Sequence, residues 1–487
     1  MINKIEEIPI TKESYPFNSA ERYLHISRMG YEEKEYYMYG TSNVYKTEKD
    51  GSVGIKNQAV PYINRFIVFR PAKKENFKGK VVVEILNATS GMDIERMWIL
   101  GWREMIREGV IYIGITSKHN TVKKLKEFNP ERYSRLSWAN PTPDVPFSFT
   151  EQDYADTGTA LGDLDITCEP GLFWDMLSDL ARTLRTKDAT NPVADYEPQK
   201  IILTGWSQSG AYMIRYINDL VYKDGEPQLF DGFLLGGPPR SFVAPLNQYE
   251  SITPATSFNI TIRKVKQPTI VLQTESDNGN MAAMYARRRN SNLPDLQIRE
   301  YDVTGASHDT QYSYVDYYCK DPDLIRINHL PAYIGHHEVS NNYPSYFLFD
   351  AGYRNLFHWI DTGVAPATCD LIEIKPNGDN VKDVFGNTKG GLRTCLLDVP
   401  TGAYYSWSNI DMGANPMFPN LDREILFGHE EPFGKDTLKA MYGSIEHYRE
   451  LAEENTKEQV TKGFIVQEDA EDMVNFAVSL AKDRGLE

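Results

Sequence analysis

A serine in the segment 200–210, which reads K-I-I-L-T-G-W-S-Q-S-G, has the surroundings of a catalytic nucleophile. Apolar residues precede the turn and others at helical spacing follow it, so the segment predicts a strand, a tight turn and a helix. A G-x-S-x-G serine in that setting acts as a nucleophile. The turn is crowded, and Gly205 and Ser209 are small enough to permit it. We expect Ser207 to be the nucleophile and Ser209 to be the weaker candidate, because bulky Tyr212 follows it closely.

A serine hydroxyl needs a base that accepts its proton during attack. A histidine can serve near neutral pH when a carboxylate fixes its tautomer. The nucleophile motif implies the chain order serine, acid, histidine. Asp277 and His308 follow Ser207 in that order, each just after a predicted strand. Glu275 stays open as the alternative acid, because the segment T-E-S-D contains both carboxylates.

The negative oxygen of a tetrahedral intermediate needs two N–H donors, the oxyanion hole. The first expected donor is the amide of Gln208, and the second is sought at Ala88 or Thr89, in the turn after the strand 79–86. His337 is a candidate for lining the substrate pocket. No metal site is expected, because H-H-E-V and G-H-E-E lack the spacing of a zinc-binding helix.

The elements that position these residues alternate between strands and helices. Strands are expected at 79–86, 110–116, 201–203, 230–236, 268–273 and 297–303, and helices at 93–108, 172–183 and after the serine. This alternation predicts an α/β fold with a mainly parallel sheet, whose catalytic groups lie at the carboxyl ends of the strands. An antiparallel meander is expected before them.

Two excursions interrupt the pattern, at about residues 117–171 and 240–267. The first is loop-like by composition and far exceeds the usual loop length, which favours a lid or pocket wall over a surface decoration. We expect residues 1–366 to form the core, including the meander and both insertions. Residues 367–487 are expected to form a C-terminal extension packed on the core, strand-like at 395–400 and helical from 435 to 486.

Composition and charge indicate which partners and which cellular location to expect. The net charge of −16 disfavours binding to a phosphate backbone, so no nucleic-acid partner is expected. The four cysteines form no C-x-x-C pair, which favours free thiols over a disulfide framework. The N-terminus lacks the apolar region of a secretory signal, and no apolar stretch is long enough to span a membrane. We expect a soluble cytoplasmic protein that needs no cofactor.

Several segments together resemble a known family, the large α/β-hydrolase domain-containing proteins of bacteria, an esterase-like group. The shared segments are V-E-I-L-N-A-T-S-G (83–91), F-N-P-E-R-Y-S-R-L (128–136), G-W-S-Q-S-G (205–210), F-D-G-F-L (230–234), Q-T-E-S-D (273–277), G-A-S-H-D (305–309), G-N-T-K-G-G-L-R-T-C-L-L-D-V-P (386–400) and L-K-A-M-Y-G-S-I-E-H-Y (438–448). They span nearly the whole chain.

The resemblance implies an α/β-hydrolase fold with Ser207 as nucleophile and His308 as base. It also implies that residues 390–400 fold back on the core. Trp206 stands where the family often has Glu, which makes Trp206 a candidate pocket residue. The predicted function is therefore hydrolysis of a small-molecule carboxylic ester through an acyl-enzyme. The alternatives are a serine peptidase, an acyltransferase or carbon–carbon bond hydrolase, and a binding module without turnover.

Overall fold

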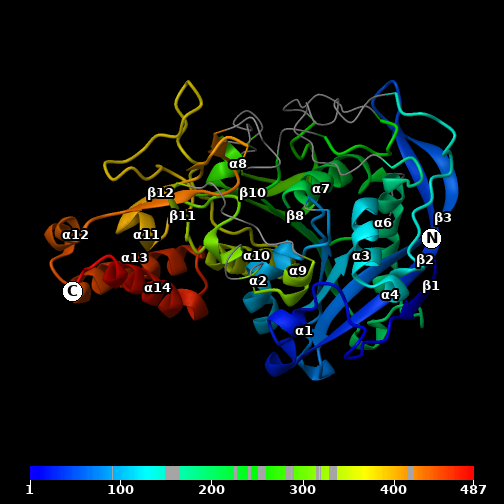
Figure 1. Ribbon diagram of the computed structural model, residues 1–487, viewed down its shortest axis with the longest axis horizontal. Coiled ribbons are helices and arrows are strands. Elements are labelled where there is room, and N and C mark those ends of the chain that lie inside the picture. The colour runs from blue at the N-terminus through cyan, green and yellow to red at the C-terminus, as the bar shows by residue number, and fades with distance from the viewer. Residues whose placement is uncertain are drawn as a thin grey trace. The chain divides into compact units, whose positions relative to one another are not determined.

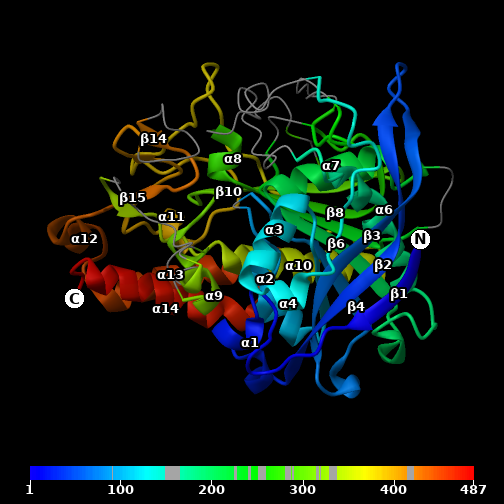
Figure 2. The same cartoon turned by 45° about the vertical axis from the view of Figure 1, so that its right-hand side comes forward.

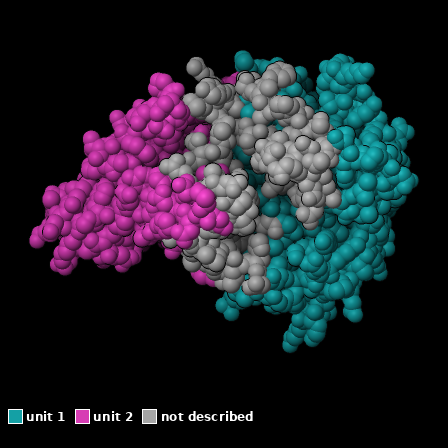
Figure 3. Space-filling model, turned by 45° about the horizontal axis from the view of Figure 1, so that its top comes forward, with its two compact units in different colours: residues 1–269, 293–297, 321–328 teal, residues 270–292, 298–320, 329–487 magenta. Residues whose placement is uncertain are grey.

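The computed structural model divides the chain into two compact units, which Figure 3 colours separately. Unit 1 contains residues 1–269, 293–297 and 321–328, and unit 2 contains residues 270–292, 298–320 and 329–487. The structure describes residues 1–89, 91–148, 165–223, 228–239, 243–250, 259–279, 287, 290–313, 317, 320–327, 337–413 and 422–487. Unit 1 holds the predicted nucleophile, and unit 2 holds the predicted acid and base.

Unit 1 begins with the predicted antiparallel meander. Strands β1 (Ile2–Glu7), β2 (Tyr31–Thr47) and β3 (Val53–Pro71) pair in that order. The β2–β3 pair is the long blue hairpin of Figure 2. The stretch of β3 from Phe66 to Phe69 is buried and pairs antiparallel with the next strand of the sheet, β5. The meander is therefore continuous with the central strands.

The central strands of unit 1 are parallel. They lie in the order β5 (Ile111–Ile115), β4 (Lys80–Ile85), β6 (Lys200–Trp206) and β7 (Gly232–Gly236). All six residues of β4 are buried, which explains its run of β-branched residues. The accompanying helices are α2 (Arg96–Arg107), α6 (Phe173–Leu184) and α7 (Gln208–Asp219) (Figure 1). The predicted α/β architecture with a mainly parallel sheet is confirmed.

The first excursion, 117–171, contains more regular structure than its composition predicts. It includes α3 (His119–Phe128), α4 (Pro130–Tyr133) and the 3-10 helix η3 (Pro170–Leu172). Helix α3 buries Val122 and Leu125, three residues apart, whose helical spacing is obscured by the lysines around them. The expectation of a loop is therefore wrong for residues 119–133. Residues 149–164 here, and 240–242 and 251–258 of the second excursion, lie outside the described residues.

Strand β8 (Val265–Thr274) leads from unit 1 into unit 2. In the sheet it is followed by β10 (Leu296–Val303) and then β9 (Ser291–Leu293); residues 293–297 are assigned to unit 1 and the rest of these two strands to unit 2. The carboxyl ends of β8 and β10 are fully buried. The short helix α8 (Glu275–Gly279) begins where β8 ends. Asp277 therefore lies three residues after the end of β8 and His308 five residues after the end of β10, close to the strand ends as the sequence led us to expect.

The C-terminal region is helical from residue 435, as predicted. It contains α12 (Lys435–Tyr442), α13 (Ile445–Lys462) and α14 (Ala470–Asp483), and α13 packs along α14 (Figure 1). The predicted strand at 395–400 is wrong, because Cys395–Asp398 forms the helix α11. Arg393 stabilises this turn by donating to the carbonyl oxygen of Leu397 and to the carboxylate of Asp398.

The segment before α11 returns to the sheet of unit 2. The amide of Leu392 donates to the carbonyl of Asp302, and the amide of Thr304 donates to the carbonyl of Leu392. Residues 390–392 therefore lie against the end of β10. The contacts divide the chain near residue 270 instead of near 367, so the boundary of a C-terminal extension at 367 stays a prediction.

The remaining elements are short, except for α10. They are α1 (Ala20–Tyr23), η1 (Ile26–Met29), η2 (Lys74–Asn76), η4 (Ala194–Tyr196), α9 (Pro322–Arg326), β11 (Val339–Ser340), α10 (Tyr346–Thr362), β12 (Gly402–Tyr405), β13 (Ser408–Asn409), β14 (Arg423–Glu424), β15 (His429–Pro432) and η7 (Gln467–Asp469). Among the described residues, no helix combines the length and the apolar character that crossing a membrane requires.

Candidate active site

Ser207 occupies the turn between β6 and α7 and has a strained backbone. Its φ of 54° and ψ of −122° place a non-glycine residue at positive φ, where the side chain is crowded by its own backbone. The amide of Ser207 donates to the carbonyl of Gly236 at 2.8 Å, and its carbonyl accepts from the amide of Ala211 at 3.1 Å. These bonds to β7 and α7 hold the turn in place. Strain of this kind is characteristic of functional sites.

The small residues around the turn are required by its packing. A Cβ on Gly205 would lie 3.1 Å from the Cβ of Ser209, and a Cβ on Gly210 would lie 2.9 Å from the Cβ of Pro238. Ser209 is fully buried, and its hydroxyl donates to the carbonyl of Leu86 at 3.2 Å. Ser209 thus fills the small position of the motif, while Ser207 alone has the strained conformation of the turn.

The loop proposed to supply the second oxyanion donor is closed at its base. Asn87 and Ile94 exchange two backbone hydrogen bonds of 2.9 and 3.0 Å, and the side chain of Asn87 donates to the carbonyl of Trp206 at 3.0 Å. The loop is therefore attached to the strand end that carries the nucleophile. The amide of Thr89 donates to Asn87 Oδ1 at 3.1 Å, so of the two sequence candidates Ala88 is the better donor.

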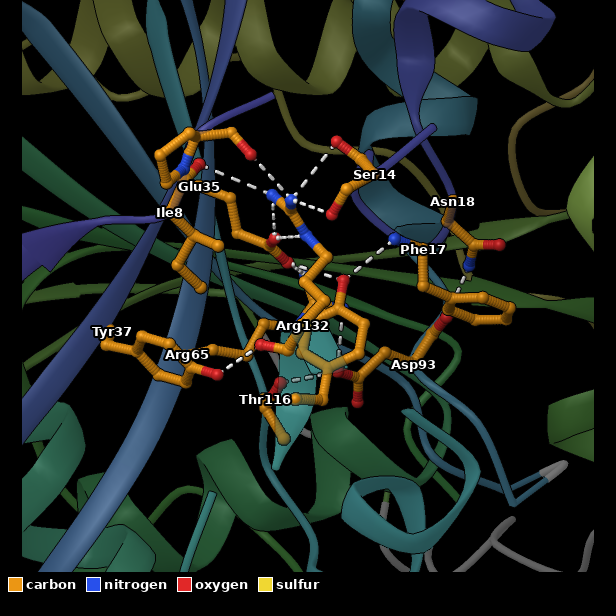
Figure 4. Close-up of polar contacts among 12 residues, drawn as sticks. Ile8, Ser14, Phe17, Asn18, Glu35, Tyr37, Arg65, Asp93, Thr116 and Arg132 are labelled. Carbon is orange, nitrogen blue, oxygen red and sulfur yellow. Dashed lines mark hydrogen bonds and ion pairs between the residues drawn. The ribbon is translucent and has the colours of Figure 1, made fainter. Parts of the chain in front are cut away.

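A buried ionic network anchors the far end of this loop (Figure 4). Asp93 Oδ2 accepts from Arg65 Nη2 at 3.1 Å and from the hydroxyl of Thr116 at 2.5 Å. Arg65 also pairs with Glu35 at 2.9 Å, and Glu35 pairs with Arg132 at 2.6 Å. These four charged side chains are at most 1% exposed. The network links the meander and α4 to Asp93, the residue before Ile94, where the loop closes on Asn87.

In unit 2, His308 and Asp277 form a buried pair. His308 Nδ1 lies 2.7 Å from Asp277 Oδ1, and the two side chains are 4% and 0% exposed. Asp277 Oδ2 accepts from the amide of Thr274 at 3.1 Å and from its hydroxyl at 2.6 Å. The amide of His308 donates to the hydroxyl of Ser276 at 3.0 Å. The structure therefore fixes both members of the pair, and Asp277 is the carboxylate that contacts the histidine.

Glu275, the alternative acid, contacts other partners. Its Oε2 accepts from the amide of Gly305 at 2.9 Å, and its Oε1 accepts from Thr388 at 2.6 Å and from Asn380 at 3.0 Å, with Lys382 Nζ at 3.3 Å. This buried carboxylate joins the turn before His308 to the segment 380–388. Its role is to hold the loop of the base in place.

The sequence did not identify the supporting roles of Thr274, Ser276 and Glu275. All three belong to or adjoin the T-E-S-D segment that contains the predicted acid. A threonine three residues before a carboxylate is a local signal, because the carboxylate can accept hydrogen bonds from both the amide and the hydroxyl of that threonine. Gly305 lies 30 residues from Glu275 along the chain, and Asn380 and Thr388 lie more than a hundred residues away, so no local signal could reveal these partners.

The two predicted pocket residues have different surroundings. Trp206 is buried in unit 1, with the guanidinium of Arg96 5.1 Å from its ring centre. His337, in unit 2, is 54% exposed and its Nε2 lies 2.9 Å from Asp411 Oδ1. Their roles in a pocket stay predictions. Among the described residues, no group of His, Cys, Asp and Glu side chains is arranged to hold a metal ion, and Cys168, Cys369 and Cys395 are free thiols.

Comparison with known proteins gives one match that covers almost the whole chain. The family model described as "Alpha/beta hydrolase domain" matches residues 5–475. No curated protein matches the sequence.

Similar solved structures include several esterases, all at low sequence identity. Esterase Est22 is 14% identical, covers 64% of this chain and 81% of its own, and has a TM-score of 0.32. The carboxylesterase Cest-2923 from Lactobacillus plantarum WCFS1 is 11% identical, with coverages of 44% and 68% and a TM-score of 0.26. XC6422 from Xanthomonas campestris, described as a serine hydrolase without a lid, is 11% identical, with coverages of 60% and 96% and a TM-score of 0.26.

Proposed function

This chain belongs to the alpha/beta hydrolase domain family, and from that premise we propose that it is a serine hydrolase that cleaves carboxylic esters through an acyl-enzyme. Membership of the family supports a hydrolase, and the proposal adds the bond and the residues that cleave it. Ser207 is the nucleophile, His308 the base and Asp277 the acid. A small-molecule ester is the proposed substrate.

The positive φ of Ser207 carries this proposal. Folding into that conformation costs about 1–3 kcal/mol, and such strain persists where it serves a function. The nucleophile elbow of hydrolases requires this turn, because it presents the serine hydroxyl above the carboxyl end of the sheet. The buried pair of His308 and Asp277 supplies the second support, since a base held by a carboxylate is what a serine nucleophile requires.

The proposed reaction proceeds in two halves. Ser207 Oγ attacks the ester carbonyl carbon as its proton passes to His308 Nε2, while Asp277 stabilises the imidazolium through Nδ1–H. Collapse of the tetrahedral intermediate breaks the bond to the alcohol, which leaves with the proton from His308. Water, activated by the same histidine, then attacks the acyl-serine and releases the acid. The proposed oxyanion donors are the amides of Gln208 and Ala88.

The first test is covalent labelling with a fluorophosphonate followed by peptide mass spectrometry. We expect an adduct on Ser207, formed with loss of fluoride. Labelling should disappear in Ser207→Ala and in His308→Ala, because the hydroxyl needs a base to react. The wild-type protein should also release acid from simple esters.

Ser209→Ala is the matched control, because it removes a hydroxyl two residues away that already donates to a backbone carbonyl. Labelling at Ser207 should persist in this variant. An adduct on Ser209 would overturn the assignment of the nucleophile. If nothing labels and no ester is cleaved, the fold serves as a binding module instead, and faster cleavage of peptides than of esters would favour a peptidase.

A further inference from the structure

Lys118 is a buried lysine that no described carboxylate neutralises through an ion pair. It follows β5, and its side chain is 1% exposed. The ammonium lies 3.3 Å from the ring centre of Tyr212 on α7 and 5.7 Å from that of Phe173, the first residue of α6. Its hydrogen bond is a long one, 3.4 Å to the hydroxyl of Ser117. Among the described residues, no carboxylate forms an ion pair with it.

The contacts of Leu86 place Lys118 beside the proposed nucleophile. The carbonyl oxygen of Leu86 accepts from Ser117 Oγ at 2.7 Å and from Ser209 Oγ at 3.2 Å. Lys118 follows Ser117 directly, and Ser207 precedes Ser209 by two residues. Both views show α3, α6 and α7 on the same part of unit 1 (Figures 1 and 2). The residue before Lys118 and the helix that follows the elbow are therefore joined through one carbonyl group, and the ammonium of Lys118 lies 3.4 Å from the Ser117 hydroxyl that binds it.

A buried ammonium without an anion costs stability. The charge loses the favourable solvation by water, and the cation–π contact with an aromatic ring offsets only part of that free energy. An apolar residue of similar length would fill the same space without this cost. The same loss of solvation lowers the pKa of the Lys118 ammonium to about 7, although the negative charge of Asp93 acts in the opposite direction. Groups that cost stability near an active site are typically retained for function.

We propose that Lys118 is the anion-binding group of the substrate pocket, so that the preferred ester carries a carboxylate near the bond that is cleaved. The inference rests on the proposed function, because it assigns a substrate class to the same site. A bound carboxylate would form the ion pair that none of the described carboxylates forms with Lys118. Lys118 would then bind the substrate and would not take part in the proton transfers. The carboxylate belongs either to the acyl part or to the alcohol part of the ester.

The experiment compares two fluorophosphonates that differ at one end of an alkyl chain, a carboxylate in one and the isosteric amide in the other. The second-order rate of labelling at Ser207 is measured by intact-protein mass spectrometry. We expect the carboxylate probe to label the wild-type protein roughly 10- to 100-fold faster, the range that a hydrogen bond to a charged group provides. In Lys118→Met the ratio should fall to one or below.

Lys56→Met is the matched control. Lys56 is also a lysine of unit 1 that lies over a tyrosine ring, 3.6 Å from the centre of Tyr249, and burial lowers its pKa as well. It lies on β3, away from the contacts of Leu86, and its loss should leave the ratio of labelling rates unchanged. The thermal midpoint of Lys118→Met should equal or exceed that of the wild type. A large fall in that midpoint together with an unchanged ratio would show that Lys118 is merely structural.

Other outcomes separate the two proposals. Equal labelling by both probes, or faster labelling by the amide, overturns the anion site and leaves the serine hydrolase intact. No labelling by either probe overturns both. Hydrolysis of monomethyl adipate and of O-acetyl-γ-hydroxybutyrate, each compared with its amide, then shows whether the charge belongs to the acyl part or to the alcohol part.

The pH dependence of the labelling ratio provides an independent readout. Lys118 is protonated below its pKa of about 7, so the preference for the carboxylate probe should be highest in mildly acidic solution and should fall as the pH rises through 7. Titration of His308 affects both probes and cancels in the ratio. In the part of the chain that the structure describes, the other ionisable groups beside Lys118 are Asp93, Tyr212 and His119, which follows Lys118 directly. The ratio should be independent of pH in Lys118→Met.

Discussion

Replacing Asp277 by Asn should lower kcat for an ester substrate about 10⁴-fold, because the variant selects the wrong tautomer of His308. The amide of Thr274 donates to Oδ2 of Asp277. An asparagine at this position must direct its oxygen to that amide, which leaves its NH₂ group facing His308 Nδ1. Nδ1 would then have to accept, and the proton would reside on Nε2. A histidine in that state cannot take the proton of Ser207.

Glu275→Gln is the control in the same segment. It makes the same change of carboxylate to amide two residues earlier, where the partners are Gly305, Thr388, Asn380 and Lys382. We expect this variant to unfold at a lower temperature and to keep kcat within about tenfold for the folded protein, since it removes the charge of a buried carboxylate whose hydrogen-bond partners do not include the ring of His308. A fall in kcat as large as that of Asp277→Asn would assign the acid to Glu275. A loss below tenfold in Asp277→Asn would remove Asp277 from the mechanism.

The strand ends explain why much of the site could be predicted from sequence. Ser207, Asp277 and His308 each follow a strand whose carboxyl end is buried, and such a strand can be predicted from the sequence without knowing which residues contact it. The sequence alone could not decide between Asp277 and Glu275 as the acid. It depends on which carboxylate faces the histidine, and that is set by segments from distant parts of the chain.

The wrong strand at 395–400 and the buried Lys118, which the sequence did not single out, both depend on tertiary contacts. The hexapeptide 395–400 is short and apolar, and periodicity alone cannot separate a strand from a helical turn over such a length. Its helical turn is stabilised by the side chain of Arg393. Lys118 is embedded in a polar stretch, and nothing in the sequence distinguishes a buried lysine from a solvated one. Burial of a charged side chain is decided by tertiary packing, here by the rings on α6 and α7.

Arg65→Met should lower the free energy of unfolding by about 3–5 kcal/mol, because it removes one partner from a buried ionic network. Arg65 is 1% exposed and lies between Glu35 and Asp93. Glu35 would keep its ion pair with Arg132, whereas Asp93 would keep only the hydroxyl of Thr116. The variant would therefore bury a carboxylate without a cation. Urea denaturation followed by circular dichroism measures the loss as a lower midpoint.

Arg135→Met is the control for this prediction. Arg135 forms an ion pair with Glu6 at 3.0 Å in the same unit, but the two side chains are 56% and 33% exposed. Solvent screens such a pair, so the midpoint should change little. Equal midpoints for the two variants would show that the network contributes no more than a surface ion pair. If the network positions the loop that carries Ala88, folded Arg65→Met should also label more slowly at Ser207, whereas Arg135→Met should label at the wild-type rate.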